Sequence, residues 1–312
     1  GYSREGLQRW LPWIKELKKE FPDFPLIVSI TSADPELLAG VAEDVVAVGA
    51  DGLQLDLSCP HHFALGTGTP STDPELTRTY VSTVKKHVRC PLMQKLTYNV
   101  RDIVEIARVC QEAGGDAVCA IDTVRSLVGI DVNSGRPALP TFGGLSGPVI
   151  KPLALYSVAC IAKNLTIPIS GVGGIMNWRD AVEFIMAGAS TVQIHTAIML
   201  EGYRVVERIV KGISEFMTER GYSSPKEFTG LALKHTMPSV NDVPSEPPIV
   251  ATVNASLCTK CWLCEESCYA SGFDAISRGD SAVLIDAAKC DGCGLCVAVC
   301  PTNALTMTER TL

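Results

Sequence analysis

The chain has 312 residues, of which 46% are hydrophobic and 20% are charged, as in ordinary globular proteins. Its net charge of -7, without a basic stripe, argues against a nucleic-acid partner. No apolar run approaches the ~20 residues that a membrane helix needs, so we expect no membrane span. The first 24 residues are amphipathic and show no signal-peptide core, which leaves the cytoplasm as the expected location.

Strand and helix patterns alternate over the first two-thirds of the chain. Asp34 followed by Pro35 is typical of a helix start, and the same "DPEL" returns at 73–76. The predicted helices cover 5–20, 34–50, 75–88, 100–113, 151–164 and 177–187. The predicted strands cover 25–31, 52–58, 91–97, 116–123, 167–174 and 191–196. Apolar strands separated by amphipathic helices indicate a parallel α/β sheet wrapped by helices, and the close spacing favours a TIM (β/α)8-type barrel.

The strand pattern falls short of a closed barrel, which needs eight strands where six are predicted. We therefore expect the first two barrel strands upstream of residue 1 or from another chain; a six-stranded open sheet is the alternative. Residues 203–235 are predicted to be helical. The expected domains are an N-terminally incomplete barrel at 1–235, a proline-rich linker at 236–250 and a cysteine-rich domain at 251–312.

The thirteen cysteines are unevenly distributed. Five are scattered, and eight crowd into residues 258–300 as two C-x2-C-x2-C-x3-C runs. This spacing is typical of bacterial ferredoxins with two 4Fe-4S clusters, in which the fourth cysteine of each run ligates the other cluster. One predicted ligand set is Cys258, Cys261, Cys264 and Cys300. The other is Cys290, Cys293, Cys296 and Cys268. A pair of zinc sites is the alternative, which the doubled run disfavours.

A flavin site is predicted at the ends of the last two strands. Gly171, Gly173 and Gly174 in "SGVGG" allow backbone N–H groups to approach a phosphate, and His195 and Thr196 end the following strand. The alternative is an ordinary tight turn.

Lys95 is a charge within an apolar strand. Beside a flavin it would stabilise the anion of the reduced form. Otherwise it extends from a strand end to solvent.

Several segments together resemble the dihydropyrimidine dehydrogenase family, and more distantly the class 1 dihydroorotate dehydrogenases. They are "DLSCPH" (56–61), "KLTYNVRDI" (95–103), "IDTV" (121–124), "FGGLSG" (142–147), "SGVGG" (170–174) and the tail cysteines. The resemblance implies an FMN-binding barrel, with Gly144 among the cofactor contacts, that reduces or oxidises the 5,6 bond of a pyrimidine. It also implies electron delivery through the two clusters from a separate FAD- and NAD(P)-binding subunit or a ferredoxin, and an oligomeric assembly.

The same resemblance implies that Cys59 is the general acid or base that moves a proton at the carbon next to the hydride position. Cys59 begins a glycine-containing stretch, 59–71, that is suited to an active-site lid. For His61 and His62 we expect a structural or proton-relay role, because no third metal ligand lies nearby in the sequence.

Two positions depart from the family pattern: Asp56 and Asp122 stand where the family has asparagine. An ionised carboxylate only accepts hydrogen bonds, whereas an amide also donates. We therefore expect a substrate richer in N–H donors, a cationic substrate, or one aspartate kept protonated by burial. Arg125 is a candidate to neutralise Asp122 or to bind a substrate carboxylate, and Ser58 and Thr123 match the family. A further alternative is an electron-transfer subunit whose barrel has no catalytic role.

Overall fold

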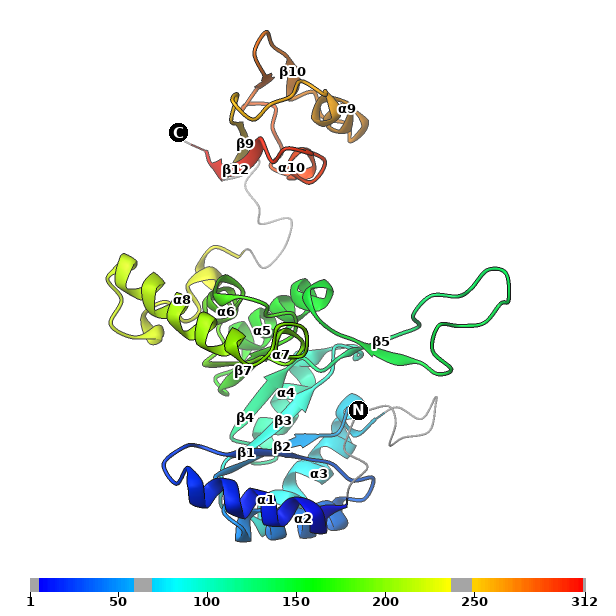
Figure 1. The fold of residues 1–312 in the computed structure, drawn as a ribbon, viewed down its shortest axis with the longest axis vertical. Helices are drawn as coiled ribbons and strands as arrows, with labels where there is room; N and C mark the ends of the chain where they lie inside the picture. Colours follow the sequence, from blue (N-terminus) through cyan, green and yellow to red (C-terminus); the bar gives the residue numbers. More distant parts are fainter. Residues whose placement is uncertain (1–5, 59–68, 237–248, 311–312) are drawn as a thin grey trace. The chain divides into compact units, whose positions relative to one another are not determined.

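The computed structural model describes residues 6–58, 69–236 and 249–310. It divides into two compact units, Gly1–His235 and Thr236–Leu312 (Figure 1). Most of the predicted linker, 236–250, lies outside the described residues, and the two units are described separately below. Among the described helices, none combines the length and apolar character of a bilayer-spanning segment.

The first unit is built on a six-stranded sheet in the order β1-β2-β3-β4-β7-β8, and every neighbouring pair is parallel. Its strands are β1 (Ile27–Ile30), β2 (Gly52–Asp56), β3 (Leu92–Leu96), β4 (Ala117–Ala120), β7 (Ile169–Val172) and β8 (Thr191–Gln193). Each lies within a segment that the sequence predicts as a strand. Within the described residues β1 and β8 form the two edges, so the sheet is an open part of a TIM-type α/β barrel.

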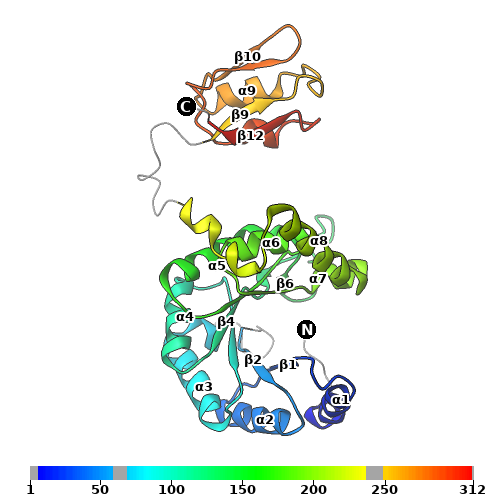
Figure 2. The same cartoon turned by 90° about the vertical axis from the view of Figure 1, so that its left-hand side faces the viewer.

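Helices cover the outer face of this sheet, and α2 to α6 follow one another around it (Figure 2). The helices are α1 (Leu7–Glu20), α2 (Pro35–Ala47), α3 (Pro74–His87), α4 (Ile103–Glu112), α5 (Lys151–Asn164), α6 (Trp178–Met186), α7 (Thr196–Glu201) and α8 (Arg204–Arg220). The expected helix starts are confirmed at Asp34 and Asp73, whose carboxylates accept the N–H groups of Leu37 and Leu76.

Alternation along the strands separates an apolar face from a polar one. In β3, Leu92 and Leu96 are fully buried, and they point to the opposite face from Lys95. On the inner face the Gln193 amide donates to Gln54 Oε1 at 2.9 Å across the sheet. The helices therefore bury one face, and the concave face is left with polar side chains.

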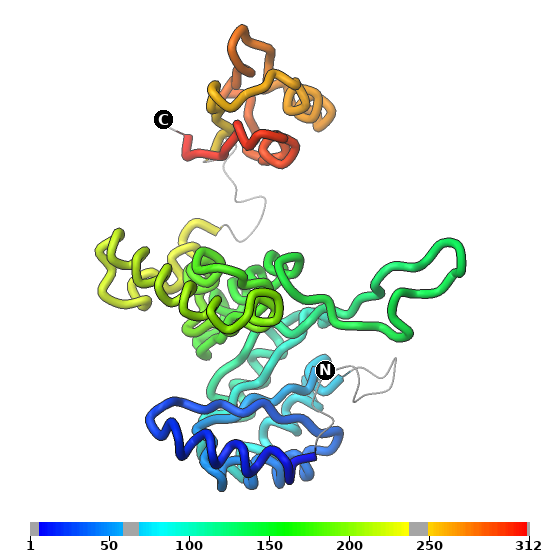
Figure 3. Tube along the Cα trace, in the orientation of Figure 1, coloured from blue at the N-terminus to red at the C-terminus, as the bar shows by residue number. Residues whose placement is uncertain are grey.

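The sequence predictions were wrong in three places. The helix predicted over 203–235 ends at Arg220, because Gly221 adopts a left-handed conformation with φ 72° and short 3-10 turns follow. The strand predicted over 191–196 stops at Gln193, and α7 begins at Thr196. The antiparallel hairpin of β5 (Val124–Ser126) and β6 (Gly143–Leu145) was not predicted, and the segment between its strands projects from the unit (Figure 3).

Where the structure describes the second unit, at 249–310, it shows two antiparallel strand pairs and two short helices. Its elements are β9 (Ile249–Val253) paired with β12 (Leu305–Glu309), β10 (Ile276–Arg278) paired with β11 (Val283–Ile285), α9 (Leu263–Ala270) and α10 (Leu295–Ala298). Its buried core is small and includes two of the predicted cluster ligands, Cys264 and Cys296.

Candidate functional site

Four predicted site residues meet at the carboxyl ends of three neighbouring strands. Asp56 ends β2 and Ser58 follows it, Lys95 lies near the end of β3, and Asp122 follows β4. The Lys95 ammonium lies 3.2 Å from Asp56 Oδ2 and 3.1 Å from Asp122 Oδ1. Ser58 Oγ lies 2.9 Å from Asp56 Oδ1 and 2.6 Å from Asp122 Oδ2. The four side chains thus form a closed ring of polar contacts, which we call the Lys–Asp–Ser–Asp ring.

The ring is buried and its lysine is charged. Asp56 and Asp122 are 6% and 9% exposed, and the Lys95 side chain is 20% exposed. Burial alone would lower the pKa of Lys95, but the carboxylates of Asp122 and Asp56 outweigh it and raise that pKa above its ordinary value. The alternative of a lysine extending freely to solvent is therefore wrong. Among the described residues, the cation that contacts Asp122 is Lys95, whereas Arg125 is exposed on β5.

Three loops meet near the predicted phosphate position. Gly173 and Gly174 have φ values of 126° and 84°, and a Cβ on Gly174 would lie 2.8 Å from the carbonyl oxygen of Gly147. A Cβ on Gly147 would in turn lie 3.3 Å from Thr196 Cγ2, and the Thr196 hydroxyl donates to Ser146 Oγ at 3.1 Å. These glycines let the three loops pack closely against one another and against α5. Contact of their backbone with a flavin phosphate stays a prediction. Ser146 and Gly147 were not singled out from the sequence, although they end the quoted segment "FGGLSG".

Two of the other predicted cofactor contacts, Gly144 and Gly171, have local packing roles. A Cβ on Gly144 would lie 2.2 Å from Thr123 Oγ1, so this glycine lets β6 close against the loop that carries Asp122. A Cβ on Gly171 would lie 2.6 Å from the Phe184 ring, which accounts for that glycine by helix packing. His195 is exposed immediately before α7. Contact of these residues with a cofactor stays a prediction.

The predicted proton donor Cys59, with His61 and His62, lies outside the described residues. Of the remaining barrel cysteines, Cys119 is fully buried on β4 beside Lys95 in the sheet register, and burial raises its pKa to about 12. It is therefore a neutral thiol near pH 7, as expected of a small core residue.

In the second unit, two cavities are each lined by four cysteines. The first is lined by Cys258, Cys261, Cys264 and Cys300. The second is lined by Cys268, Cys290, Cys293 and Cys296. These are the two crossed sets that the ferredoxin spacing predicts, and none of these eight described cysteines forms a disulfide. The donor set and its arrangement around a cavity fit an iron–sulfur cluster in each set.

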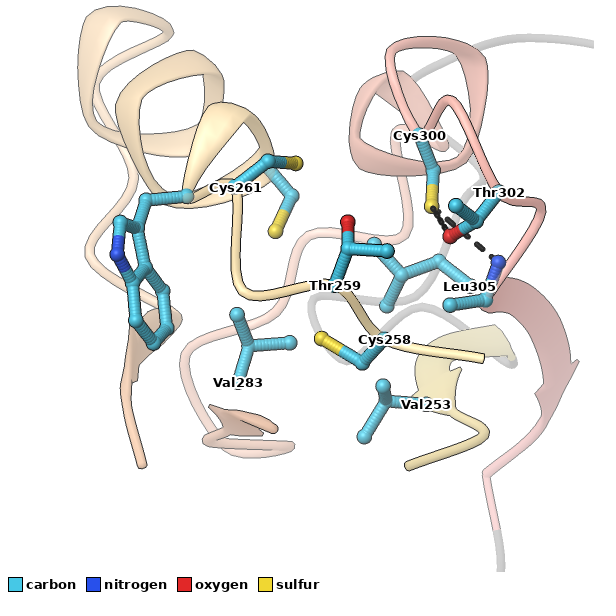
Figure 4. Close-up of a pocket in the computed structure, with 11 residues that line it drawn as sticks. Val253, Cys258, Thr259, Cys261, Val283, Cys300, Thr302 and Leu305 are labelled. Atoms are coloured by element: carbon cyan, nitrogen blue, oxygen red, sulfur yellow. Dashed lines mark hydrogen bonds between the residues drawn. The ribbon is translucent and has the colours of Figure 1, made fainter. Parts of the chain in front are cut away.

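Figure 4 shows how the first cavity draws on both motifs, with Cys258 and Cys261 from one run and Cys300 from the other. Cys300 Sγ accepts the N–H of Ala304 at 3.2 Å and lies 3.8 Å from the Thr302 hydroxyl. Burial alone would raise the pKa of Cys300, but the N–H groups of Thr302 and Ala304 outweigh it and lower that pKa. The hydrogen bonds thus favour the thiolate, which is the form that binds metal.

Family comparisons agree with this geometry. The dihydroorotate dehydrogenase family model matches residues 1–217, and the 4Fe-4S dicluster domain model matches residues 251–307. The catalytic subunit of dihydroorotate dehydrogenase B (NAD(+)) from Pyrococcus abyssi is 47% identical over 226 residues, covering 72% of this chain and 75% of that relative. The corresponding subunit from Methanothermobacter thermautotrophicus is 44% identical over 233 residues, covering 74% of this chain and 76% of the relative.

A third relative extends across the cysteine-rich unit as well. The NAD-dependent dihydropyrimidine dehydrogenase subunit PreA of Escherichia coli is 33% identical over 318 aligned positions, covering 98% of this chain and 77% of the relative. The dihydroorotate dehydrogenase family binds FMN, and the dicluster model indicates iron–sulfur clusters rather than zinc. The chain therefore belongs to the dihydroorotate dehydrogenase family, as an FMN- and iron–sulfur-dependent oxidoreductase with a C-terminal 4Fe-4S dicluster domain.

Proposed function

We propose that the chain is a catalytic subunit that oxidises or reduces the 5,6 carbon–carbon bond of a pyrimidine-like ring. The Lys–Asp–Ser–Asp ring carries this proposal, because it places hydrogen-bonding groups and a buried cation at the strand ends where barrel enzymes bind their substrates. FMN, when bound, supplies the hydride chemistry at one ring carbon. The protein must then bind the ring, orient it and move a proton at the neighbouring carbon.

Each of these tasks has candidate residues. Asp56, Ser58, Asp122 and Thr123 offer hydrogen bonds to the polar edge of the ring. Lys95 holds a positive charge that the two carboxylates keep in place. Cys59 is the proposed proton donor and acceptor, because a thiol with an ordinary pKa of about 8.5 is mostly protonated at neutral pH. Its role rests on the resemblance of "DLSCPH" to the family motif.

Electrons are proposed to pass between the barrel and a partner through two 4Fe-4S clusters. The two four-cysteine cavities support a pair of clusters in the second unit. The relatives are named as subunits of larger enzymes, which supports a separate electron-transfer partner. For that partner we propose an FAD- and NAD(P)-binding subunit or a ferredoxin.

Two ring substrates are favoured by different observations. Dihydropyrimidines such as dihydrouracil are favoured by the relative that matches 98% of the chain. Dihydroorotate is favoured by the higher identity, 47%, over the barrel. Dihydroorotate carries a carboxylate that dihydrouracil lacks, so a cation at the site entrance would distinguish the two. Exposed Arg125 is the candidate for that cation.

The test is anaerobic reduction of the bound flavin. The flavin-loaded chain is mixed in turn with dihydrouracil, dihydrothymine and dihydroorotate, and the flavin absorbance is followed. Bleaching of the flavin by one of these compounds identifies the substrate. The Cys59→Ala variant should slow the bleaching. The control variant Cys160→Ala, which changes a half-buried cysteine in α5, should leave the rate unchanged. If none bleaches a flavin that dithionite still reduces, the pyrimidine proposal is wrong, and a different N-heterocycle takes its place.

A further inference from the structure

A lysine–aspartate pair ties together two of the loops that meet at the predicted phosphate position. Lys151 is the first residue of α5, and its ammonium lies 2.6 Å from Asp180 Oδ1 and 3.0 Å from Glu183 Oε2, both on α6. The other carboxylate oxygen of Asp180 accepts the backbone N–H groups of Met176 and Asn177, at 2.9 and 3.1 Å. One carboxylate therefore holds both the start of α5 and the segment that leads into α6.

This pair is charged and largely shielded from water. Asp180 is buried, and the Lys151 side chain is 26% exposed. Burial alone would raise the pKa of Asp180, but the hydrogen bonds from Lys151 and from the N–H of Met176 outweigh it and lower that pKa. The aspartate is therefore ionised at neutral pH, and the ammonium of Lys151 is matched by carboxylates of α6.

The glycines predicted to approach the phosphate lie against the same end of α5. Gly174 has a φ of 84°, and a Cβ on it would lie 2.8 Å from Lys151 Cβ and 3.0 Å from Lys151 N. A Cβ on Gly173, whose φ is 126°, would lie 2.9 Å from that of Ala154 in the first turn of α5. The position of these glycines therefore depends on where α5 begins, which is the point that the Lys151–Asp180 pair holds.

We propose that Lys151 and Asp180 are positioning residues for the FMN phosphate. By linking the start of α5 to the segment before α6, the pair sets the spacing between the loop at 146–147 and the glycines at 173–174 before the cofactor binds. It acts through these loops and does not contact the phosphate, because its ammonium is already paired. The inference rests on the proposed function only through the predicted phosphate position. FMN affinity is measured without a substrate, so it fails separately from the bleaching test.

The experiment compares the binding of FMN and of riboflavin, which lacks the phosphate, to the flavin-free full chain by fluorescence titration. Lys151→Met keeps the stem beside Gly174 but removes the charge. It should weaken FMN binding about tenfold, as loss of supporting residues does around metal ligands, and leave riboflavin binding unchanged. Lys151→Arg should restore most of the FMN affinity, because a guanidinium also pairs with a carboxylate. Equal weakening for both flavins, or unchanged FMN affinity, would overturn the proposal.

Lys85→Met is the matched control. Lys85 pairs with Asp116, which precedes β4 and also accepts the N–H of Leu92 at the start of β3. Its side chain is 27% exposed, and its stem packs against Gly114, whose φ is 94°. Lys85 thus has surroundings like those of Lys151 at the opposite end of the strands. Its loss should lower stability without changing the affinity for either flavin, and an equal loss of FMN affinity there would count against the proposal.

A second measurement requires no variant. Hydrogen exchange of the flavin-free parent chain should show that the N–H groups of Met176 and Asn177 are protected before FMN is added, because Asp180 already accepts both. Rapid exchange of both groups, with protection only after FMN binds, would show that the cofactor and not the pair orders this loop. That result would refute the positioning role.

Discussion

Replacing Lys95 by methionine tests whether the ring is an interdependent buried charge cluster. Methionine keeps most of the side-chain volume but removes the charge that pairs with Asp56 and Asp122, whose side chains are only 9% and 12% exposed. Breaking a buried ion pair by removing one partner costs about 3–5 kcal/mol. Because the Lys95 side chain keeps 20% exposure, water screens part of its charge, and we expect a loss near the lower bound, about 3 kcal/mol. For a unit of this size that loss lowers the Tm by roughly 6–12 °C.

The assay is thermal unfolding of the FMN-free protein by circular dichroism, so that a change in FMN affinity does not contribute. Lys211→Met is the control, because the Lys211–Glu215 pair is exposed on α8 and should be worth less than about 1 kcal/mol. Adding Asp56→Asn and Asp122→Asn to Lys95→Met should recover most of the loss. A Tm equal to that of the parent, or a triple variant no more stable than the single one, would refute the reasoning.

The remaining predictions concern alkaline pH, glycine packing and the cysteine cavities. Because the folded-state pKa of Lys95 is raised, its contribution is fully present below the ordinary value of about 10.4 and is lost only as pH rises through the raised value. The deficit of Lys95→Met should therefore be constant from neutral pH to about pH 10, as pH-dependent melting would show. Gly188→Ala should cost about 1–3 kcal/mol, because its Cβ would lie 2.4 Å from that of Ala162 and its φ is 112°. Gly40→Ala, with open space around it in α2, should instead gain about 0.5–1 kcal/mol in the same urea titration. Cys261→Ala should remove clearly more than half of the bound iron by metal analysis, because losing one cluster destabilises the small core that holds the other, whereas Cys160→Ala should remove none.

Much of the architecture follows from local patterns. The apolar strands and the caps at Asp34 and Asp73 are set by residues close together in the sequence. The end of α8 was also marked locally, because Gly221 and Pro225 are typical of a helix stop, and the helix predicted over 203–235 passed over both. The β5–β6 hairpin also escaped prediction, since its strands have three residues each and its segment Gly143–Leu145 begins with two glycines.

The sequence predicts the individual residues of the Lys–Asp–Ser–Asp ring, but it does not predict the contacts among them. Asp56, Ser58, Lys95 and Asp122 were each singled out, yet nothing in their spacing shows that one lysine and one hydroxyl bridge both carboxylates. That contact depends on β3 lying between β2 and β4, which is a property of the sheet order. For the same reason Arg125, nearer to Asp122 in the sequence, was a reasonable but incorrect choice as its neutralising partner.

The crossed cysteine cavities have a consequence for how the second unit holds together. Cys264 and Cys296 line the two cavities and also belong to its small buried core, alongside residues such as Ala251, Ile276 and Leu305. Each cluster would therefore crosslink distant parts of the chain and occupy volume in the core of the unit. Oxidative loss of one cluster would open a void and release a crosslink together, so damage to either would be expected to unfold the whole electron-carrying unit rather than to disable half of it.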